Sequence, residues 1–197
     1  MSLHSKWANI KRKKAALDSK RADNWNKILR LLVVAAKKGG GDVSSNPTLR
    51  LAVEKAKEAR MPKENIEKAI KRGTGELEGQ TFEEAFYEGF GPDGGAILIE
   101  CLTDNKNRTV AELRTILSKN GGSLGTVGSV AYVFGTDYNN PIFKVKLTSE
   151  ENSVALEKIL DSLDENEDVQ EVYTNYEDDE EWLSLGLIPE PLPQAIQ

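Results

Sequence analysis

Apolar residues in the first third of the chain recur with the spacing of amphipathic helices. Within residues 25–36 they form one stripe at intervals of three and four residues, which predicts a helix with one buried face. The glycines at 39–41 end this pattern. A second helix is predicted from residues 46–47, where Asn is a suitable cap and Pro a suitable first helical residue, and a third over residues 62–73. The sequence therefore predicts a small three-helix bundle.

After residue 80 the pattern changes to short apolar runs rich in β-branched residues and bounded by turn residues, which are typical of strands. Thr109 and Glu112 have the spacing of a capping box, which predicts that a helix begins at residue 109. The predicted strands are 85–90, 96–102, 129–134, 142–147 and 169–174. One predicted helix begins at residue 109, and another spans residues 150–163. This order predicts an α+β fold in which the three-helix bundle is followed by a ferredoxin-like, mainly antiparallel α/β layer domain.

The charge of the chain changes sign between these two parts. Residues 1–75 contain 19 Lys and Arg against 7 Asp and Glu, whereas residues 76–197 contain 7 against 25, which leaves a net charge of −6. Three glycines fall at the change, within residues 73–79. We therefore expect a basic helical domain at 1–75, an acidic α+β domain at 80–175, and an acidic, Pro-rich tail at 176–197.

The composition excludes several classes of site. Cys101 is the one cysteine and His4 the one histidine of the chain, which excludes an internal disulfide, a multi-cysteine zinc site and a histidine metal cluster. No apolar run approaches the roughly 20 residues that span a bilayer, and the first residues lack the apolar core of a signal peptide. We expect a non-enzymatic cytoplasmic protein, or a mitochondrial matrix protein if the source is a eukaryote, with no cofactor, no metal and no membrane association.

The basic domain is the predicted nucleic-acid interface, because Lys and Arg neutralise phosphates and release counterions. Its arm also contains Trp7, an aromatic ring that can stack on an exposed base. The other interpretation is a solvated basic arm whose tryptophan packs on the bundle. The candidate nucleic-acid-binding residues are Lys6, Trp7, Lys11, Arg12, Lys13, Lys14, Lys20 and Arg21, together with Lys27, Arg30 and Lys37 on the face of the first helix opposite its apolar stripe.

Other motifs give weaker indications. The polar segment 103–109 precedes a helix, where Asn105, Asn107 and Arg108 are candidates for phosphate contact, although a turn that caps its own helix explains it better. The glycine-rich segment 89–95 lacks the Lys-Ser/Thr ending of a phosphate loop and predicts a hairpin turn. Cys101 has no basic partner nearby in the sequence and is interpreted as a core residue. The acidic run 177–182 is interpreted as a solvated tail, with folding back onto the basic domain as the alternative.

Several longer motifs resemble those of the YebC/PmpR family. They lie, in the order in which the family has them, at residues 4–11, 35–42, 46–50, 61–66, 70–73, 103–109 and 168–175. The resemblance implies transcriptional regulators that bind DNA, and mitochondrial relatives that activate translation of a cytochrome oxidase subunit. It also implies a helical first domain, and a second α/β domain interrupted by an inserted third.

This chain departs from the family pattern near residues 135–141. Where the family continues into the inserted domain, residues 136–140 lead directly to a segment that matches the return from it. We therefore expect the inserted domain to be absent, and residues 135–141 to form a short loop between adjacent antiparallel strands.

Together these observations predict a monomeric transcriptional regulator that binds DNA through its basic helical domain, with a possible protein partner on the acidic domain. The alternatives are a ribosome-associated translation factor that binds rRNA or tRNA, and a scaffold whose basic domain binds an acidic protein. The candidate cations are mostly lysines spread along an arm, which favours contact with the nucleic-acid backbone over base readout.

Overall fold

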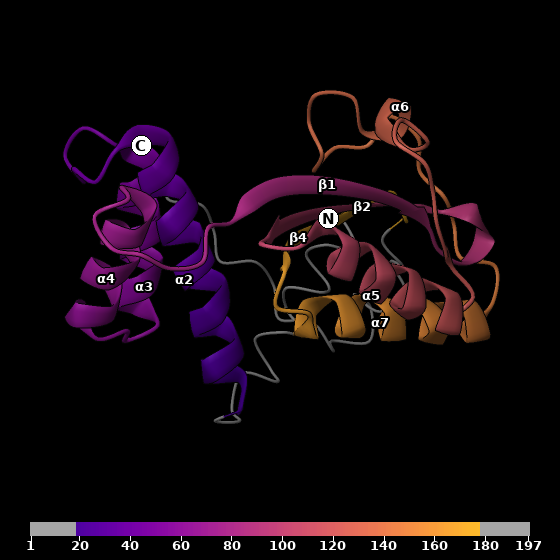
Figure 1. The fold of residues 1–197 in the computed structure, drawn as a ribbon. Helices are drawn as coiled ribbons and strands as arrows, with labels where there is room; N and C mark the ends of the chain where they lie inside the picture. Colours follow the sequence, from indigo (N-terminus) through magenta and orange to yellow (C-terminus); the bar gives the residue numbers. More distant parts are fainter. Residues whose placement is uncertain (1–18, 178–197) are drawn as a thin grey trace, which may run out of the picture.

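The computed structural model describes residues 19–177, with side chains from residue 24 onward. A group of helices is followed by a sheet that has helices on one face (Figure 1). None of the helices in this described part is long and apolar enough to cross a membrane. The elements are α2 (Ser19–Gly39), α3 (Pro47–Glu58), α4 (Lys63–Gly73), β1 (Glu83–Phe90), the 3₁₀ turn η1 (Pro92–Gly94), β2 (Ala96–Thr103), α5 (Lys106–Lys119), β3 (Ser123–Leu124), α6 (Ala131–Phe134), α7 (Glu150–Glu165) and β4 (Val169–Thr174).

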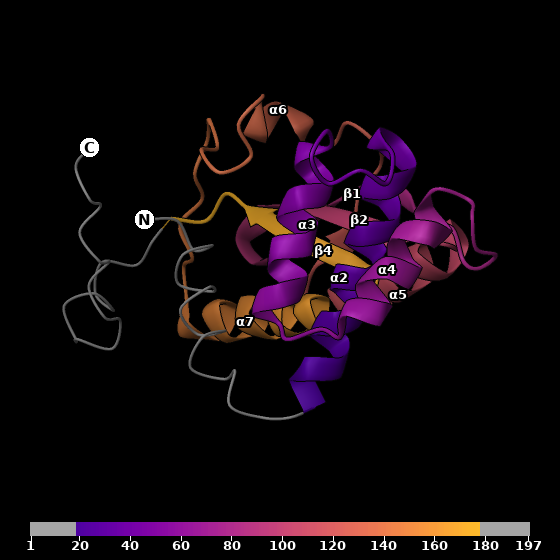
Figure 2. The same cartoon turned by 90° about the vertical axis from the view of Figure 1, so that its left-hand side faces the viewer.

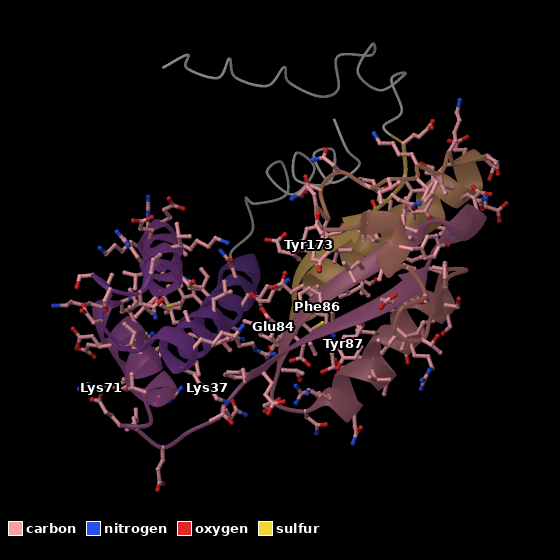
Figure 3. All side chains as sticks on the ribbon, turned by 90° about the horizontal axis from the view of Figure 1, so that it is seen from above. Lys37, Lys71, Glu84, Phe86, Tyr87 and Tyr173 are labelled. Atoms are coloured by element: carbon pink, nitrogen blue, oxygen red, sulfur yellow. The ribbon has the colours of Figure 1, made fainter. Side chains whose placement is uncertain are left out.

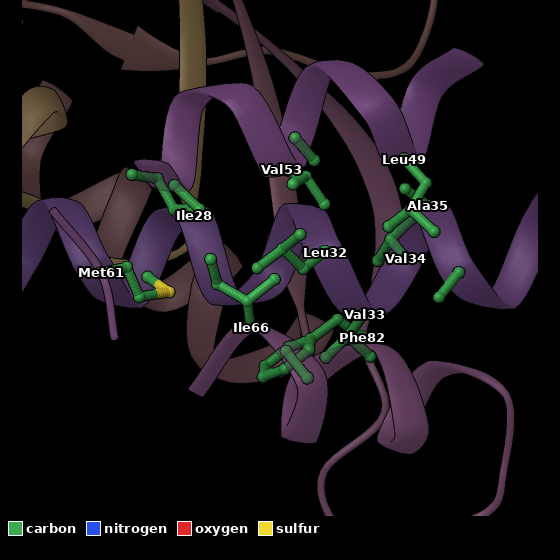
Figure 4. Close-up of a cluster of buried hydrophobic side chains, with 14 of the residues drawn as sticks. Ile28, Leu32, Val33, Val34, Ala35, Leu49, Val53, Met61, Ile66 and Phe82 are labelled. Carbon is green, nitrogen blue, oxygen red and sulfur yellow. The ribbon is translucent and has the colours of Figure 1, made fainter. Parts of the chain in front are cut away.

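The predicted three-helix bundle is confirmed. Helix α2 packs against both α3 and α4, and the three helices lie in front of the sheet in Figure 2. The Asn46 side chain caps α3 by accepting a hydrogen bond from the Leu49 N–H at 3.0 Å. The buried cluster of the bundle also includes Phe82 and Leu102 from the sheet domain. Its larger members are shown in Figure 4, among them Ile28, Leu32, Val33, Leu49, Val53, Met61, Ile66 and Phe82.

Helices α2 and α4 are in close contact at Gly73. A Cβ atom at this residue would lie 2.4 Å from the Val33 carbonyl oxygen and 2.6 Å from the Ala36 Cβ. Neither of these neighbours can move without displacing the α2 backbone. Gly73 is therefore required by the helix crossing.

We expect Gly73→Ala to lower the free energy of unfolding by about 1–3 kcal/mol, the usual cost of overpacking. Gly79→Ala is the control, because its new Cβ would meet only the flexible Arg72 side chain, at 3.0 Å, and should change the free energy of unfolding by no more than about 0.5 kcal/mol. Urea denaturation measures both. Equal effects of the two substitutions would contradict the close crossing at Gly73.

The sheet has the order β3-β1-β2-β4, and each pair of neighbours is antiparallel. Strands β2 and β3 are joined through α5 and lie on either side of β1, which is the split β-α-β arrangement of ferredoxin-like sheets. Helices α5 and α7 cover one face (Figure 1). The predicted α+β fold is confirmed, and β1 and β2 form the hairpin that the glycine-rich segment 89–95 predicts.

Two of the predicted strands are wrong. Residues 129–134 contain the short helix α6, because Val130, Val133 and Phe134 are buried at helical spacing and the Glu88 carboxylate accepts hydrogen bonds from the N–H groups that precede and open the helix. Residues 142–147 form no strand and make one isolated bridge, between Val145 and Tyr176. The loop 135–141 consequently does not join adjacent strands.

Two predicted boundaries also change. Helix α5 begins one turn before the expected capping box, since Asn105 is its cap and accepts a hydrogen bond from the Arg108 N–H at 3.1 Å. Tyr176, which was assigned to the tail, is 1% exposed, and its hydroxyl donates to the Pro92 carbonyl at 2.6 Å. Tyr176 therefore belongs to the buried cluster between the sheet and helices α5 and α7.

Candidate nucleic-acid interface

Helix α2 is covered on two sides. Its apolar face packs against α3 and α4, and its polar face packs against the sheet. Arg30 on this face is 7% exposed. Its guanidinium donates to the Leu102 carbonyl at 3.0 Å, pairs with Glu167 at 3.1 Å and pairs with Asp168. It also lies 5.0 Å from the centre of the Phe82 ring. Arg30 thus connects the helical bundle to the sheet.

Asp168 is the centre of this junction. Its carboxylate is almost fully buried and pairs with Arg30 from the helical domain and with Arg108 from α5, the latter at 3.0 Å. The Thr109 hydroxyl lies 2.7 Å from Asp168 Oδ2, and Thr103 lies 3.2 Å from the same oxygen. Burial alone would raise the pKa of Asp168, but the hydrogen bonds from Thr109, Arg30 and Arg108 outweigh it and hold this pKa below its ordinary value.

The expected exposure of Lys27 and Arg30 on an outer face is therefore wrong. The Lys27 ammonium donates to the Asp164 carbonyl oxygen at 2.6 Å and lies 3.4 Å from the Asp164 carboxylate. The helical period shows which face of α2 is apolar, but the partners of the opposite face are more than 70 residues away in the sequence. The structure assigns Arg30 and Lys27 to the domain junction.

A different set of cations is exposed where α2 and α4 end. We call Lys37, Lys71 and Arg72 the cationic end. The last turns of α2 and α4 adjoin, since a Cβ at Gly73 would lie 3.2 Å from the Lys37 backbone nitrogen, and Figure 3 shows Lys37 and Lys71 on the helical domain. All three side chains are exposed, and none makes an ion pair with a carboxylate of the described residues. Glu83 is nevertheless near Lys37, since its pKa is lowered by Lys106 first and also by Lys37.

The surroundings limit where an anion can bind at the cationic end. Asp42 and Glu67 line the shallow depression beside Lys71, and hydrogen bonds from Ser44 and Ser45 lower the pKa of Asp42 and keep it charged. Neighbouring Lys38 is already paired with Glu84, at 2.7 Å. The carboxylates of Asp42 and Glu67 therefore oppose an anion in the depression beside Lys71. A local role remains for these cations too, because positive charge at a helix C-terminus offsets the helix dipole.

The remaining predicted interface residues are not placed by the structure. Lys6, Trp7, Lys11, Arg12, Lys13 and Lys14 lie outside the described residues, and Lys20 and Arg21 belong to α2 without described side chains. Of the eleven candidates, Lys37 is the one described as exposed. Lys71 and Arg72 were not among the candidates from the sequence, although they directly precede Gly73, the glycine at which the third helix was predicted to end.

The weaker motifs have structural roles in the described chain. Asn105 caps α5, and Arg108 is held by Asp104 at 2.8 Å and by Asp168, as expected of a turn that caps its own helix. Cys101 is fully buried, and burial followed by the nearby Asp168 raises its pKa to about 12. Its thiol is therefore protonated at neutral pH, in agreement with its interpretation as a core residue.

Comparison with protein families gives two consecutive matches. Residues 5–76 match the TACO1/YebC protein N-terminal domain, and residues 82–138 match the TACO1/YebC second and third domain. The second match ends near residues 135–141, where we expect the inserted domain to be absent. That absence remains a prediction.

Individual relatives agree with these matches. A "Probable transcriptional regulatory protein" of Persephonella marina is 41% identical over 240 residues, covering 90% of this chain and 96% of the relative. One of the same name from Cupriavidus metallidurans is 59% identical over 134 residues, covering 68% of this chain, so that the match spans 56% of the relative's length. A solved structure, titled a conserved hypothetical protein from Aquifex aeolicus, superposes with a TM-score of 0.76 at 32% identity, over 92% of this chain and 96% of that one.

Proposed function

The chain belongs to the TACO1/YebC family, and from this premise we propose that it is a non-catalytic regulator that binds nucleic acid through its helical domain. The distribution of ion pairs supports the proposal. Cations that face the sheet domain, such as Arg30, are paired with carboxylates, whereas the cationic end has no such partner among the described residues. Unpaired surface cations can neutralise phosphates at little desolvation cost.

DNA is the first target we propose, because relatives that match most of the chain are named transcriptional regulatory proteins. The helical domain would then contact the phosphate backbone, with the basic arm at 6–14 adding to the cationic end. Such contacts position a protein on a duplex without reading its sequence.

One observation favours RNA on the ribosome as the second candidate. The exposed residues of α4 are Lys and Glu apart from Arg72, and half of those of α3 are Lys and Glu, with Arg50 its exposed Arg, whereas a helix that reads bases in the major groove presents several Arg, Asn or Gln side chains. Glutamates such as Glu54 and Glu58 would be repelled by the phosphates on either side of a groove. Backbone recognition of a folded RNA requires no such helix.

Crosslinking in cells, combined with sedimentation of ribosomes, tests the proposal and separates its two targets. A DNA-binding regulator should crosslink to DNA and remain in the light fractions. A ribosome-associated regulator should sediment with ribosomes and crosslink to rRNA or tRNA. Crosslinks to neither nucleic acid, under conditions in which a known DNA-binding protein crosslinks, would contradict the proposed function.

A further inference from the structure

Three large apolar side chains lie exposed at the short helix α6 and the segment that follows it, on the side of the sheet opposite α5 and α7 (Figure 1). Tyr132 of α6 is 64% exposed, and Ile142 and Phe143 are 64% and 58% exposed. The ring centres of Tyr132 and Phe143 are 6.5 Å apart, and the Ile142 N–H donates to the Val133 carbonyl at 2.7 Å. We call Tyr132, Ile142 and Phe143 the apolar patch. Single exposed apolar residues are common, but a group of adjoining ones is typical of a surface that another segment covers.

The last described residues run alongside the segment that contains Ile142 and Phe143. Val145 forms a parallel bridge with Tyr176, and the Glu177 N–H donates to the Val145 carbonyl at 2.8 Å. The Asn175 side chain donates to the Phe143 carbonyl at 3.1 Å. The chain therefore leaves the described fold next to the apolar patch.

Two exposed lysines flank this point of exit. Lys144 and Lys146 lie on either side of Val145, and neither makes an ion pair with a carboxylate among residues 24–177. Residues 177–181 are all Asp or Glu. The tail therefore begins with the charge that the two lysines attract, although surface pairs of this kind orient a segment more than they hold it.

An apolar segment follows the acidic run. Residues 182–188, which lie outside the described residues, contain Trp182, Leu183, Leu185, Leu187 and Ile188. Trp182 follows Glu177 by five residues, which span up to about 17 Å when extended. From its exit beside Val145 the tail can thus bring Trp182 to Phe143, two residues away along the neighbouring segment.

We propose that residues 182–188 dock on the apolar patch of the same chain. Docking removes the apolar side chains of both the tail and the patch from water, which is favourable, while the acidic run stays beside Lys144 and Lys146. A second copy of the chain is a less suitable occupant. Because the acidic run emerges next to the patch, two copies that met through their patches would bring like charges together.

Photo-crosslinking of the full chain, with Trp182 replaced by benzoylphenylalanine, tests the proposal. Mass spectrometry should find crosslinks within one chain, to the peptides that contain Tyr132 or Phe143. Substituting Tyr132→Ser and Phe143→Ser together should abolish these crosslinks. Leu51→Ser is the matched control, since Leu51 is 62% exposed on α3, and it should leave them unchanged. Crosslinks between chains, or to residues 1–75 instead of the patch, would overturn the proposal.

The dye ANS, which binds exposed apolar surface, provides a second test on the full chain. Substituting Trp182→Ser and Leu185→Ser should raise its fluorescence at least about twofold by uncovering the patch. The rise should disappear when Tyr132→Ser and Phe143→Ser are present as well, and melting temperatures establish that all these variants fold. A dye signal that the two tail substitutions leave unchanged would overturn the proposal, as would a rise that persists without the patch.

Discussion

Asp168→Ala is expected to lower the free energy of unfolding by about 3–5 kcal/mol, the usual result of removing one partner from a buried ion pair. The substitution leaves the buried Arg30 guanidinium without the Asp168 counter-charge and removes one of the acceptors available to the Thr109 hydroxyl. Because Arg30 and Asp168 belong to different domains, the junction between the domains should loosen as well.

Asp104→Ala is the matched control for this prediction. Asp104 also pairs with Arg108, at 2.8 Å, but its side chain is more exposed than that of Asp168. Exposed pairs of this kind contribute about 0–1 kcal/mol. Urea denaturation should therefore separate the two variants clearly, and a similar small loss for both would show that the Asp168 network does not hold the domains together.

The same carboxylate predicts how stability depends on pH. The native pKa of Asp168 lies below its ordinary value of 3.8, so the native state favours the ionised form. Its contribution is complete above the unfolded-state pKa and is lost as the pH falls through the native pKa. Asp168→Asn should show a shallower loss of stability below pH 3.8 than the parent protein, and an unchanged acid profile would assign that loss to other carboxylates.

Local patterns were sufficient to predict most of the fold. The apolar stripe of α2 and the Asn46 cap of α3 are signals within a few residues, as are the glycines of the β1–β2 turn, and these elements form as predicted. Residues 129–134 were misread because a run of four to six apolar residues suits a strand and a short helix alike. What decides between them is the Glu88 carboxylate, about 40 residues earlier in the chain.

The candidate sites were predicted less completely, for a related reason. A helical period distinguishes the apolar face of α2 from its polar face, but it does not show that Arg30 on the polar face meets Asp168. Nor does the alternation of β1 reveal that Phe86 stays exposed opposite Glu100 of β2. Both features arise from residues far apart in the sequence that the sheet brings together.

Nucleic-acid binding should respond most strongly to the basic arm. Changing Lys11, Arg12, Lys13 and Lys14 together to Gln removes four potential phosphate contacts, and should weaken binding at least about tenfold for every sequence tested, since such contacts are independent of sequence. Stability should change by no more than about 0.5 kcal/mol, because we expect these side chains to lie outside the core. Fluorescence anisotropy with several unrelated duplexes and RNAs measures the affinity.

Trp7→Ala provides a second measure of the same arm. If the ring stacks on bases, the substitution should cost more on single-stranded or looped RNA than on duplex DNA, where the bases are already stacked. Equal losses on both would assign Trp7 to packing on the helical domain. Affinity that survives the four-fold arm change would instead place the main contacts at the cationic end, which Lys37, Lys71 and Arg72 changed to Gln would test.

The salt dependence of binding tests the central claim, that the basic helical domain binds nucleic acid through phosphate contacts. The logarithm of the binding constant should fall linearly with the logarithm of the salt concentration. Each phosphate contact removed, in the arm or at the cationic end, should reduce the slope by roughly 0.7 for single strands and 0.9 for duplex DNA. A slope near zero for the unmodified protein, or one that stays the same when both sets of cations are changed to Gln, would contradict the account.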